Sequence, residues 1–199
     1  MAVRGGDGAS STNFDAVLAA AIEGAGWAST AIWVEYSPAV AAFLAARGSA
    51  EPEDLTSEVF LAVFNTLPAF RGGEPELRSY IFSIAYRRLV DELRRRSRRG
   101  QSIEWSDELD QRRSLSAEAE AETRLGDQRA LALLDSLPED QRNVMVLRII
   151  ADLTIEQIAV VLDKRVGAVK ALQRRALESL RKKTLPSRTP DGILSDSGL

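Results

Sequence analysis

The chain has no cysteine and no histidine among its 199 residues. Their absence excludes disulfides, thiol nucleophiles, imidazole bases and the usual zinc ligands. No apolar run approaches the length of a membrane span, and residues 1–13 lack the apolar core of a signal peptide. We therefore predict a cytoplasmic protein that is not inserted in a membrane. We also predict no catalytic residue, no metal and no cofactor.

The charges are distributed unevenly along the chain, although the formal net charge is only −3. Residues 78–99 hold eight Lys and Arg against two acidic residues, and residues 164–183 hold eight against one. Between these blocks, residues 100–127 hold eight acidic residues against three basic ones. Two basic blocks on either side of an acidic segment indicate two nucleic-acid-binding segments on one chain.

Apolar residues recur at helical spacing, and no alternating stretch is long enough to predict a strand. In the first half of the chain the predicted helices cover residues 14–24, 29–47, 52–67 and 75–99. The second of these is capped by Ser29 or Thr30, and Pro38 is expected to kink or restart it. Glycine and proline, 13 and 7 in number, cluster between these segments, which favours helices with short connections.

The fold predicted from this pattern is all-α, with two small helical domains. The first domain covers residues 14–99, including an Ala-rich helical extension at its start, and the second covers residues 127–183. Residues 100–126 form a predicted flexible acidic linker, and the terminal segments 1–13 and 184–199 are expected to be disordered. About 27 extended linker residues could span roughly 90 Å. Two turns of duplex DNA cover about 70 Å, so the domains could occupy well-separated sites.

Residues 137–183 carry three apolar runs with helical spacing, and the last two are joined by only Asp163-Lys164-Arg165. Thr154 is a predicted N-cap, and Gln157 stands at the capping-box position three residues later. A short helix, a tight turn and a basic second helix are typical of a DNA-reading helix-turn-helix. The face offered to a major groove would carry Arg165, Lys170, Gln173, Arg174 and Arg175. The alternative is a plain antiparallel helix pair with a solvated basic face.

The upstream basic block interleaves aromatic side chains with cations. Bases of single-stranded DNA stack on aromatic rings while the backbone follows positive charge. The candidate residues are Phe70, Arg71, Arg78, Tyr80, Phe82, Tyr86, Arg87 and Arg88. The alternative is that Tyr80 and Phe82 belong to the core and that the arginines form a solvated helix end.

Two segments resemble the bacterial extracytoplasmic-function (group IV) sigma factors. The run EPEDLTSEVFLAVFNTLPAFRGGEPELRSYIFSIAYRRLVDELRRRSRR is similar to region 2 of that family. The run LLDSLPEDQRNVMVLRIIADLTIEQIAVVLDKRVGAVKALQRRALESLR is similar to region 4. The two modules agree with the family in order and in spacing, so the resemblance is specific.

The resemblance implies a subunit of RNA polymerase that confers promoter recognition and has no enzymatic activity. The exposed face of Asp54, Ser57 and Glu58 would dock the core polymerase. The aromatic and basic block would bind the −10 element, and the helix after Arg165 would read the −35 element. The acidic linker would run towards the RNA exit path. Two modules on one linker also suggest an anti-sigma factor that holds the chain inactive.

Three positions depart from the family pattern. Arg165 stands where a Ser is common, Ala168 where Thr is frequent, and Tyr80 where Trp is frequent.

Two other functions are possible for such a sequence. The first is a stand-alone helix-turn-helix regulator, which leaves residues 70–99 and the acidic linker unexplained. The second is a helical enzyme, which would need paired carboxylates on an apolar face. No such pair stands out in the sequence.

Overall fold

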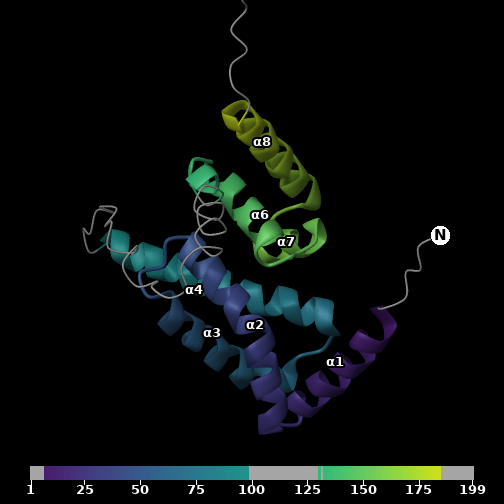
Figure 1. The fold of residues 1–199 in the computed structure, drawn as a ribbon. Helices are drawn as coiled ribbons and strands as arrows, with labels where there is room; N and C mark the ends of the chain where they lie inside the picture. The colour runs from purple at the N-terminus through teal and green to yellow at the C-terminus, as the bar shows by residue number, and fades with distance from the viewer. Residues whose placement is uncertain (1–6, 99–129, 131, 185–199) are drawn as a thin grey trace, which may run out of the picture.

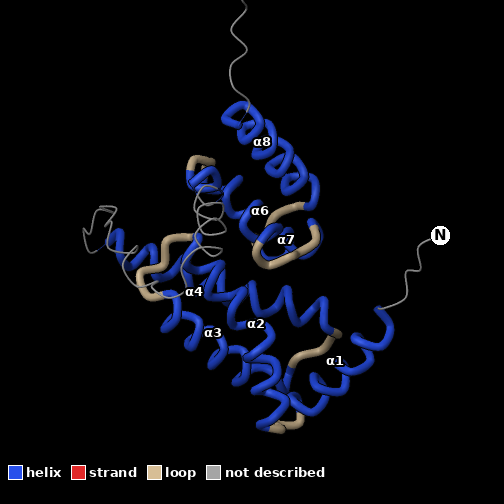
Figure 2. The backbone as a smooth tube through the Cα atoms, viewed as in Figure 1, coloured by secondary structure: helices blue, strands red, loops and turns tan. Residues whose placement is uncertain are grey.

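The computed structural model describes residues 7–98, 130 and 132–184, and in these ranges the chain is helical with no strand. Figures 1 and 2 show two groups of helices, one above the other. The prediction of an all-α fold is confirmed. The elements are α1 (Asp7–Ile22), α2 (Gly26–Ala46), α3 (Pro52–Thr66), the 3-10 turn η1 (Leu67–Ala69), α4 (Glu74–Arg98), α6 (Glu139–Ile149), α7 (Ile155–Val161) and α8 (Val166–Thr184).

The first group, α1 to α4, is organised around α2, which packs on α1, α3 and α4. Each helix contributes apolar residues at spacings of three and four, so one face of each is buried. Burying a large apolar side chain stabilises the fold by about 1.5–3 kcal/mol. The fully buried residues of this core include Ile32, Tyr36, Val40, Phe43, Leu44, Val59, Phe60, Val63, Leu77, Ile81, Phe82 and Ala85.

The second group, α6 to α8, packs around a smaller apolar cluster formed by Val144, Leu147, Leu153, Ile158, Val169 and Ala176. The predicted capping box at the start of α7 is confirmed. The Gln157 backbone N–H donates to Thr154 Oγ1 at 3.2 Å, and the Thr154 N–H donates to Gln157 Oε1 at 2.7 Å. These two bonds satisfy donors that the first turn of a helix leaves free.

Several predicted boundaries differ from the observed ones. Helix α1 begins at Asp7 rather than Phe14, because packing of its later turns on the core supports residues that would not form a helix alone. Helix α2 begins at Gly26 and has no side-chain cap, since the Thr30 hydroxyl donates instead to the Gly26 carbonyl at 3.0 Å. The helix also continues through Pro38, so the predicted restart is wrong. Its buried neighbours Tyr36 and Val40 hold both halves against the core. The whole of the predicted linker, residues 100–126, lies outside the described residues, as do residues 1–6 and the tail from residue 185.

The two groups are in contact. Helix α4 packs against α7, and α2 contacts α6, as Figure 1 shows. Because of these contacts, the two groups form one packed body in this structure.

Among the helices described, none combines the length and the apolar character needed to cross a membrane.

Candidate nucleic-acid interface

The loop at residues 70–73 lies between η1 and α4 and carries the first predicted DNA-binding residues. The Phe70 and Tyr80 ring centroids are 5.3 Å apart, and the Tyr80 hydroxyl is hydrogen-bonded to Thr66 Oγ1. Both rings are half-buried, so each is partly exposed to solvent. Arg71 is exposed and donates from Nη1 to the Phe70 carbonyl at 2.6 Å. The loop thus presents two aromatic rings and a cation together, which is the combination that stacking on an unpaired base requires.

Gly72 gives this loop its shape. Its φ of +144° lies in a region that side chains disfavour, and a Cβ added there would come within 2.7 Å of Glu76 Cβ. The Gly73 N–H donates to Glu76 Oε2 at 2.9 Å, which ties the loop to the first turn of α4. We call residues 70–73 the capture loop. Its backbone is fixed by the helix that follows it.

Arg78 is held at the start of α4 by a buried tyrosine. The Arg78 guanidinium lies 5.1 Å from the Tyr36 ring centroid, and its Nη2 lies 3.7 Å from Glu74 Oε1. The Tyr36 hydroxyl donates to the same Glu74 oxygen at 3.4 Å. Burial raises the pKa of Tyr36 well above its usual value, so this hydroxyl stays protonated and remains a donor.

The remaining predicted residues of α4 differ in exposure. Arg87 and Arg88 are exposed, and Arg88 Nη1 lies 3.6 Å from Glu58 Oε2 on α3. Tyr86 is half-buried, and burial together with the nearby Glu139 raises its pKa. Phe82 is fully buried, with its ring 5.7 Å from that of Phe43. The prediction that Phe82 binds DNA is wrong, because a side chain enclosed by the core cannot stack on a base.

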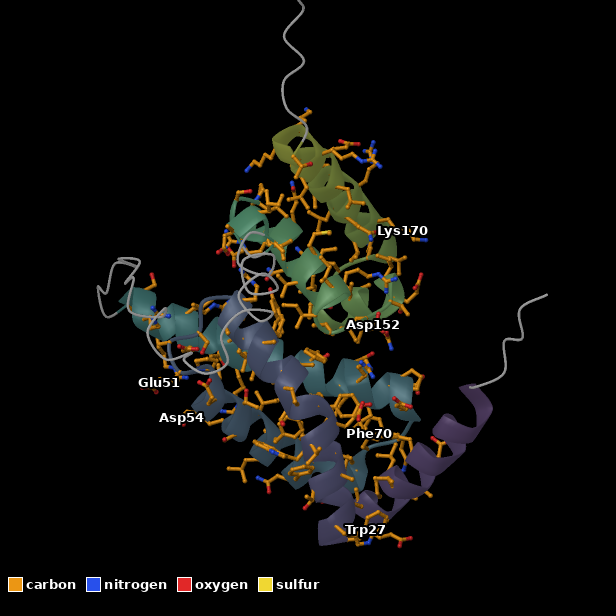
Figure 3. All side chains as sticks on the ribbon, in the orientation of Figure 1. Trp27, Glu51, Asp54, Phe70, Asp152 and Lys170 are labelled. Atoms are coloured by element: carbon orange, nitrogen blue, oxygen red, sulfur yellow. The ribbon has the colours of Figure 1, made fainter. Side chains whose placement is uncertain are left out.

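The helix-turn-helix is formed by α7, a turn and α8. Asp163 adopts a left-handed conformation with φ of +51°, and the Lys164 N–H closes the turn on the Ala159 carbonyl at 2.9 Å. Helix α8 buries Val169, Leu172 and Ala176. Lys170 and Arg174 lie on the side away from this buried stripe, Gln173 and Arg175 flank it, and Arg165 stands just before the helix. Figure 3 shows Lys170 projecting away from the helix group. Arg165, Lys170, Arg174 and Arg175 are exposed, and Gln173 is half-buried.

The predicted docking face on α3 is also exposed. Asp54, Ser57 and Glu58 all reach solvent, and Asp54 lies on the side of α3 away from α6 to α8 in Figure 3. Glu51 and Glu53 add negative charge to the same end of the helix. This end of α3 is therefore acidic and exposed to solvent, with Glu58 also paired to Arg88.

The contact between the two helix groups depends on residues that no sequence pattern singled out. Arg47, only 6% exposed, donates from Nε to Asn143 Oδ1 at 2.6 Å, and Asn143 is 2% exposed. Arg47 Nη2 also lies 3.7 Å from Glu139 Oε1. Burial lowers the pKa of Arg47, and the nearby Arg142 adds to the effect. Arg47 and Asn143 are 96 positions apart, so nothing local in the sequence marks them as partners.

A second set of contacts covers the start of α4. Gln157 Nε2 donates to the Pro75 carbonyl at 2.8 Å, and Arg78 Nη1 donates to the Ala151 carbonyl at 3.5 Å. Arg78 is a predicted DNA-binding residue, and α7 lies alongside the helix that carries it. The second helix group therefore covers part of the predicted −10 surface while leaving the acidic end of α3 open.

Comparison with known proteins gives a consistent result over both helix groups. A family model described as Sigma-70 region 2 matches residues 32–99, and one described as Sigma-70, region 4 matches residues 133–182. The ECF RNA polymerase sigma factor ShbA of Streptomyces griseus is 36% identical over 65% of this chain and 69% of its own length. The ECF RNA polymerase sigma factor SigD of Mycobacterium tuberculosis is 30% identical over 84% of this chain and 82% of its own. The chain belongs to the ECF RNA polymerase sigma factors.

Solved structures agree with this assignment at the level of the fold. CnrH, in complex with the cytosolic domain of CnrY, aligns with a TM-score of 0.62 at 22% identity, over 85% of this chain and 96% of that one. RpoE of Bartonella quintana, in complex with the anti-sigma factor NepR, aligns with a TM-score of 0.59 at 21% identity, over 77% and 94%. The family resemblance expected from the sequence is confirmed.

As a sigma factor, the protein binds core RNA polymerase and directs promoter-specific initiation of transcription. Its family consists of non-enzymatic initiation factors. The region 2 match covers α2 from Ile32 onward and the whole of α3 and α4, and the region 4 match contains α6 and α7 and most of α8. Helix α1 of this sigma factor lies ahead of the region 2 match.

Proposed function

We propose that this sigma factor recognises the −10 and −35 promoter elements through two separate surfaces. The observation that carries the proposal is the capture loop together with Tyr80 of α4, where two partly exposed rings and the cation Arg71 lie at the start of a basic helix. The second surface is the exposed face of α8. The chain itself catalyses no reaction in this scheme, and it acts in the cytoplasm, where polymerase and promoter DNA are found.

At the −10 element, the capture loop and α4 bind the unpaired non-template strand. Phe70 and Tyr80 offer ring faces for a flipped base, while Arg71 and Arg78 neutralise phosphates beside it. Arg87 and Arg88 extend the positive surface along α4, with four more arginines in the chain just beyond them: Arg94, Arg95, Arg96 and Arg98. A protein that binds only the open form of DNA lowers the cost of opening it.

At the −35 element, α8 enters the major groove as the recognition helix. Arg165, Arg174 and Arg175 suit guanine edges or phosphates, and Gln173 suits adenine. Arg174 lies 3.6 Å from Glu178, an exposed pair that a DNA phosphate can replace at small cost. Base preference at this surface rests on Arg165, which lies just before the first turn of α8, and on Gln173 near the middle of the helix.

Docking on core polymerase uses the acidic end of α3. Asp54, Ser57 and Glu58 are exposed there, and their charge fits a basic helical partner. Because the second helix group leaves this end open, polymerase can engage the protein in the packed arrangement described here.

Promoter binding then requires the two helix groups to separate. Helix α7 covers the start of α4, where Arg78 bonds to the Ala151 carbonyl. The linker of about 27 residues reaches roughly 90 Å when extended, which exceeds two turns of duplex. Separation therefore frees Arg78 for DNA and lets α8 reach the distant element at the same time.

Run-off transcription with core polymerase tests the proposal against a stand-alone regulator. Transcription start sites are first mapped after induced expression, and the mapped promoter is then used as template. The proposal expects a specific transcript only when the protein and core polymerase are both present, and loss of that transcript when either element is scrambled. A protein that binds duplex sites tightly without polymerase and yields no specific transcript would support the stand-alone regulator instead.

We also propose that an anti-sigma factor controls this protein. Two structural neighbours, CnrH and the RpoE of Bartonella quintana, are described in complexes with the cytosolic domain of CnrY and with the anti-sigma factor NepR. The two helix groups here, joined by the long segment between them, offer surfaces that such a protein could hold together. Affinity capture from the native cell tests this, since recovery of polymerase subunits alone would contradict it.

A further inference from the structure

Helix α1 packs directly against the elements that form the capture loop. It contacts η1 and α4 as well as α2, although it lies ahead of the region 2 match. Leu18 and Ala21 are buried at 3% and 4% exposure and anchor the helix to the core. A Cβ added at Gly73 would lie 3.9 Å from Asp15 Oδ1, so α1 reaches the loop itself. Helix α1 therefore packs behind the proposed −10 surface.

Phe14 of α1 is linked to Arg78 through a series of contacts. The Phe14 ring meets the Tyr36 ring edge to face, with centroids 6.0 Å apart and planes at 80°. Tyr36 in turn donates to Glu74 and lies under the Arg78 guanidinium. Phe14, Tyr36 and the Glu74–Arg78 pair thus form a continuous series of contacts from α1 to the first turn of α4.

The composition of α1 argues against direct contact with DNA. Residues 7–22 contain no lysine and no arginine, and they include Asp7 and Asp15. A helix without cations gains nothing from phosphates, and Asp15 beside the loop would repel them. Its contribution to DNA binding must then act through the residues that it supports.

We propose that Phe14 is a positioning residue for −10 recognition, and the inference rests on the −10 function proposed above. Phe14 holds the Tyr36 ring in place, and the fixed ring sets the direction of Arg78 and the register of the capture loop. Helix α1 thereby raises the affinity for the −10 strand without contacting DNA itself. Since Phe14 is only half-buried while Leu18 and Ala21 anchor the helix, its effect on DNA can be separated from its effect on folding.

The test compares Phe14→Ala, Phe14→Tyr and Tyr36→Phe in the full chain assembled with core polymerase. The probe is a fluorescent single strand carrying the −10 sequence of a mapped promoter, and its affinity is measured by anisotropy. Trp27→Ala is the matched control, because Trp27 is an aromatic residue in the first turn of α2 that is 63% exposed (Figure 3). Polymerase affinity, binding to a −35 duplex and the melting temperature are measured on every variant.

Phe14→Ala is expected to weaken −10 strand binding roughly three- to ten-fold, with polymerase affinity and −35 binding unchanged. Phe14→Tyr keeps the ring and should restore wild-type binding. Tyr36→Phe removes only the hydroxyl that reaches Glu74 and should weaken the same step.

Two results would overturn the inference. One is wild-type −10 affinity in Phe14→Ala, whatever the affinity of Tyr36→Phe. The other is a parallel loss of melting temperature, polymerase affinity and −35 binding in Phe14→Ala, which would make Phe14 a folding residue. If the wild-type holoenzyme does not bind the −10 strand, the proposed −10 function itself fails, which is a distinguishable outcome.

Discussion

Arg47 Nε donates to Asn143 Oδ1 at 2.6 Å, and this bond joins the end of α2 to the middle of α6. Both side chains are buried, and Glu139 supplies a carboxylate 3.7 Å from the same guanidinium. A buried hydrogen bond to a charged group contributes about 1.5–3 kcal/mol. The contact between the two helix groups is therefore specific and depends on few side chains.

Replacing Arg47 should loosen this contact. Arg47→Met keeps an apolar stem and leaves Asn143 buried without its partner, so we expect the packed arrangement to lose about 2 kcal/mol. The chain has no cysteine, so dyes can be attached only at cysteines introduced at the exposed positions Glu23 and Lys182. Energy transfer between them should fall in Arg47→Met, and the free protein should bind a −10 strand more tightly. Arg95→Met, at an exposed site on α4, is the control for energy transfer alone, because Arg95 belongs to the positive surface proposed for the −10 strand. Equal energy transfer in both variants would contradict the prediction.

Gly72 and Gly26 should respond in opposite ways to alanine. A Cβ at Gly72 meets Glu76 Cβ at 2.7 Å in a backbone conformation of positive φ, whereas a Cβ at Gly26 meets nothing within 4 Å. Strain of about 1–2 kcal/mol at Gly72 should weaken −10 strand binding by the holoenzyme roughly ten-fold. Gly26→Ala should leave binding unchanged and raise the melting temperature slightly. Anisotropy with a labelled strand, together with thermal unfolding, distinguishes these outcomes, and a Gly72→Ala variant with wild-type affinity would count against the capture loop.

Reversing charge on α3 should weaken docking on polymerase. Asp54→Lys places a cation where a basic partner is expected, and like charges at an interface should reduce the affinity about ten-fold or more. Glu23→Lys makes the same charge change at an exposed site after α1 and should have no effect. Competition for core polymerase against a labelled wild-type chain measures both variants. Equal competition by the two would remove Asp54 from the docking face.

Lys170 on α8 should act through phosphate. Lys170→Ala is expected to weaken binding of the holoenzyme to −35 duplexes of any sequence, and to reduce the slope of log affinity against log salt by about 1. Lys182→Ala removes an exposed lysine about three turns further along the same helix and should leave the slope nearly unchanged. A Lys170→Ala variant that loses affinity for one base sequence only would assign this residue to base reading instead.

The parts of the structure that follow local rules were predictable. Thr154 and Gln157 satisfy each other within one helical turn, so their spacing was enough to predict the capping box. The exposed face of α8 followed from the same periodicity that buries Val169, Leu172 and Ala176. Phe82 was assigned to DNA although it precedes Ala85 by three residues and Leu89 by seven, a spacing that already placed it on the buried stripe.

The contacts between the helix groups were not predictable, because they join distant parts of the chain. Arg47 ends a helix, where a charged side chain is normally solvated, and its burial depends on Asn143, which lies 96 positions away. The role of α1 was equally hidden. Phe14 has an ordinary apolar spacing, and only the packed structure shows that its ring meets Tyr36 beside the capture loop.

Gln157 uses its two side-chain polar atoms in two contacts, and the proposed separation of the helix groups would break only one of them. Its amide oxygen caps α7, and its amide nitrogen donates to the Pro75 carbonyl of α4. When the groups part, the nitrogen loses its partner, but the oxygen keeps the cap, so the reading motif leaves α4 fully formed. A change at the side-chain nitrogen of Gln157 alone would therefore alter how easily the two helix groups separate. The cap of α7, and with it the helix-turn-helix, would stay intact.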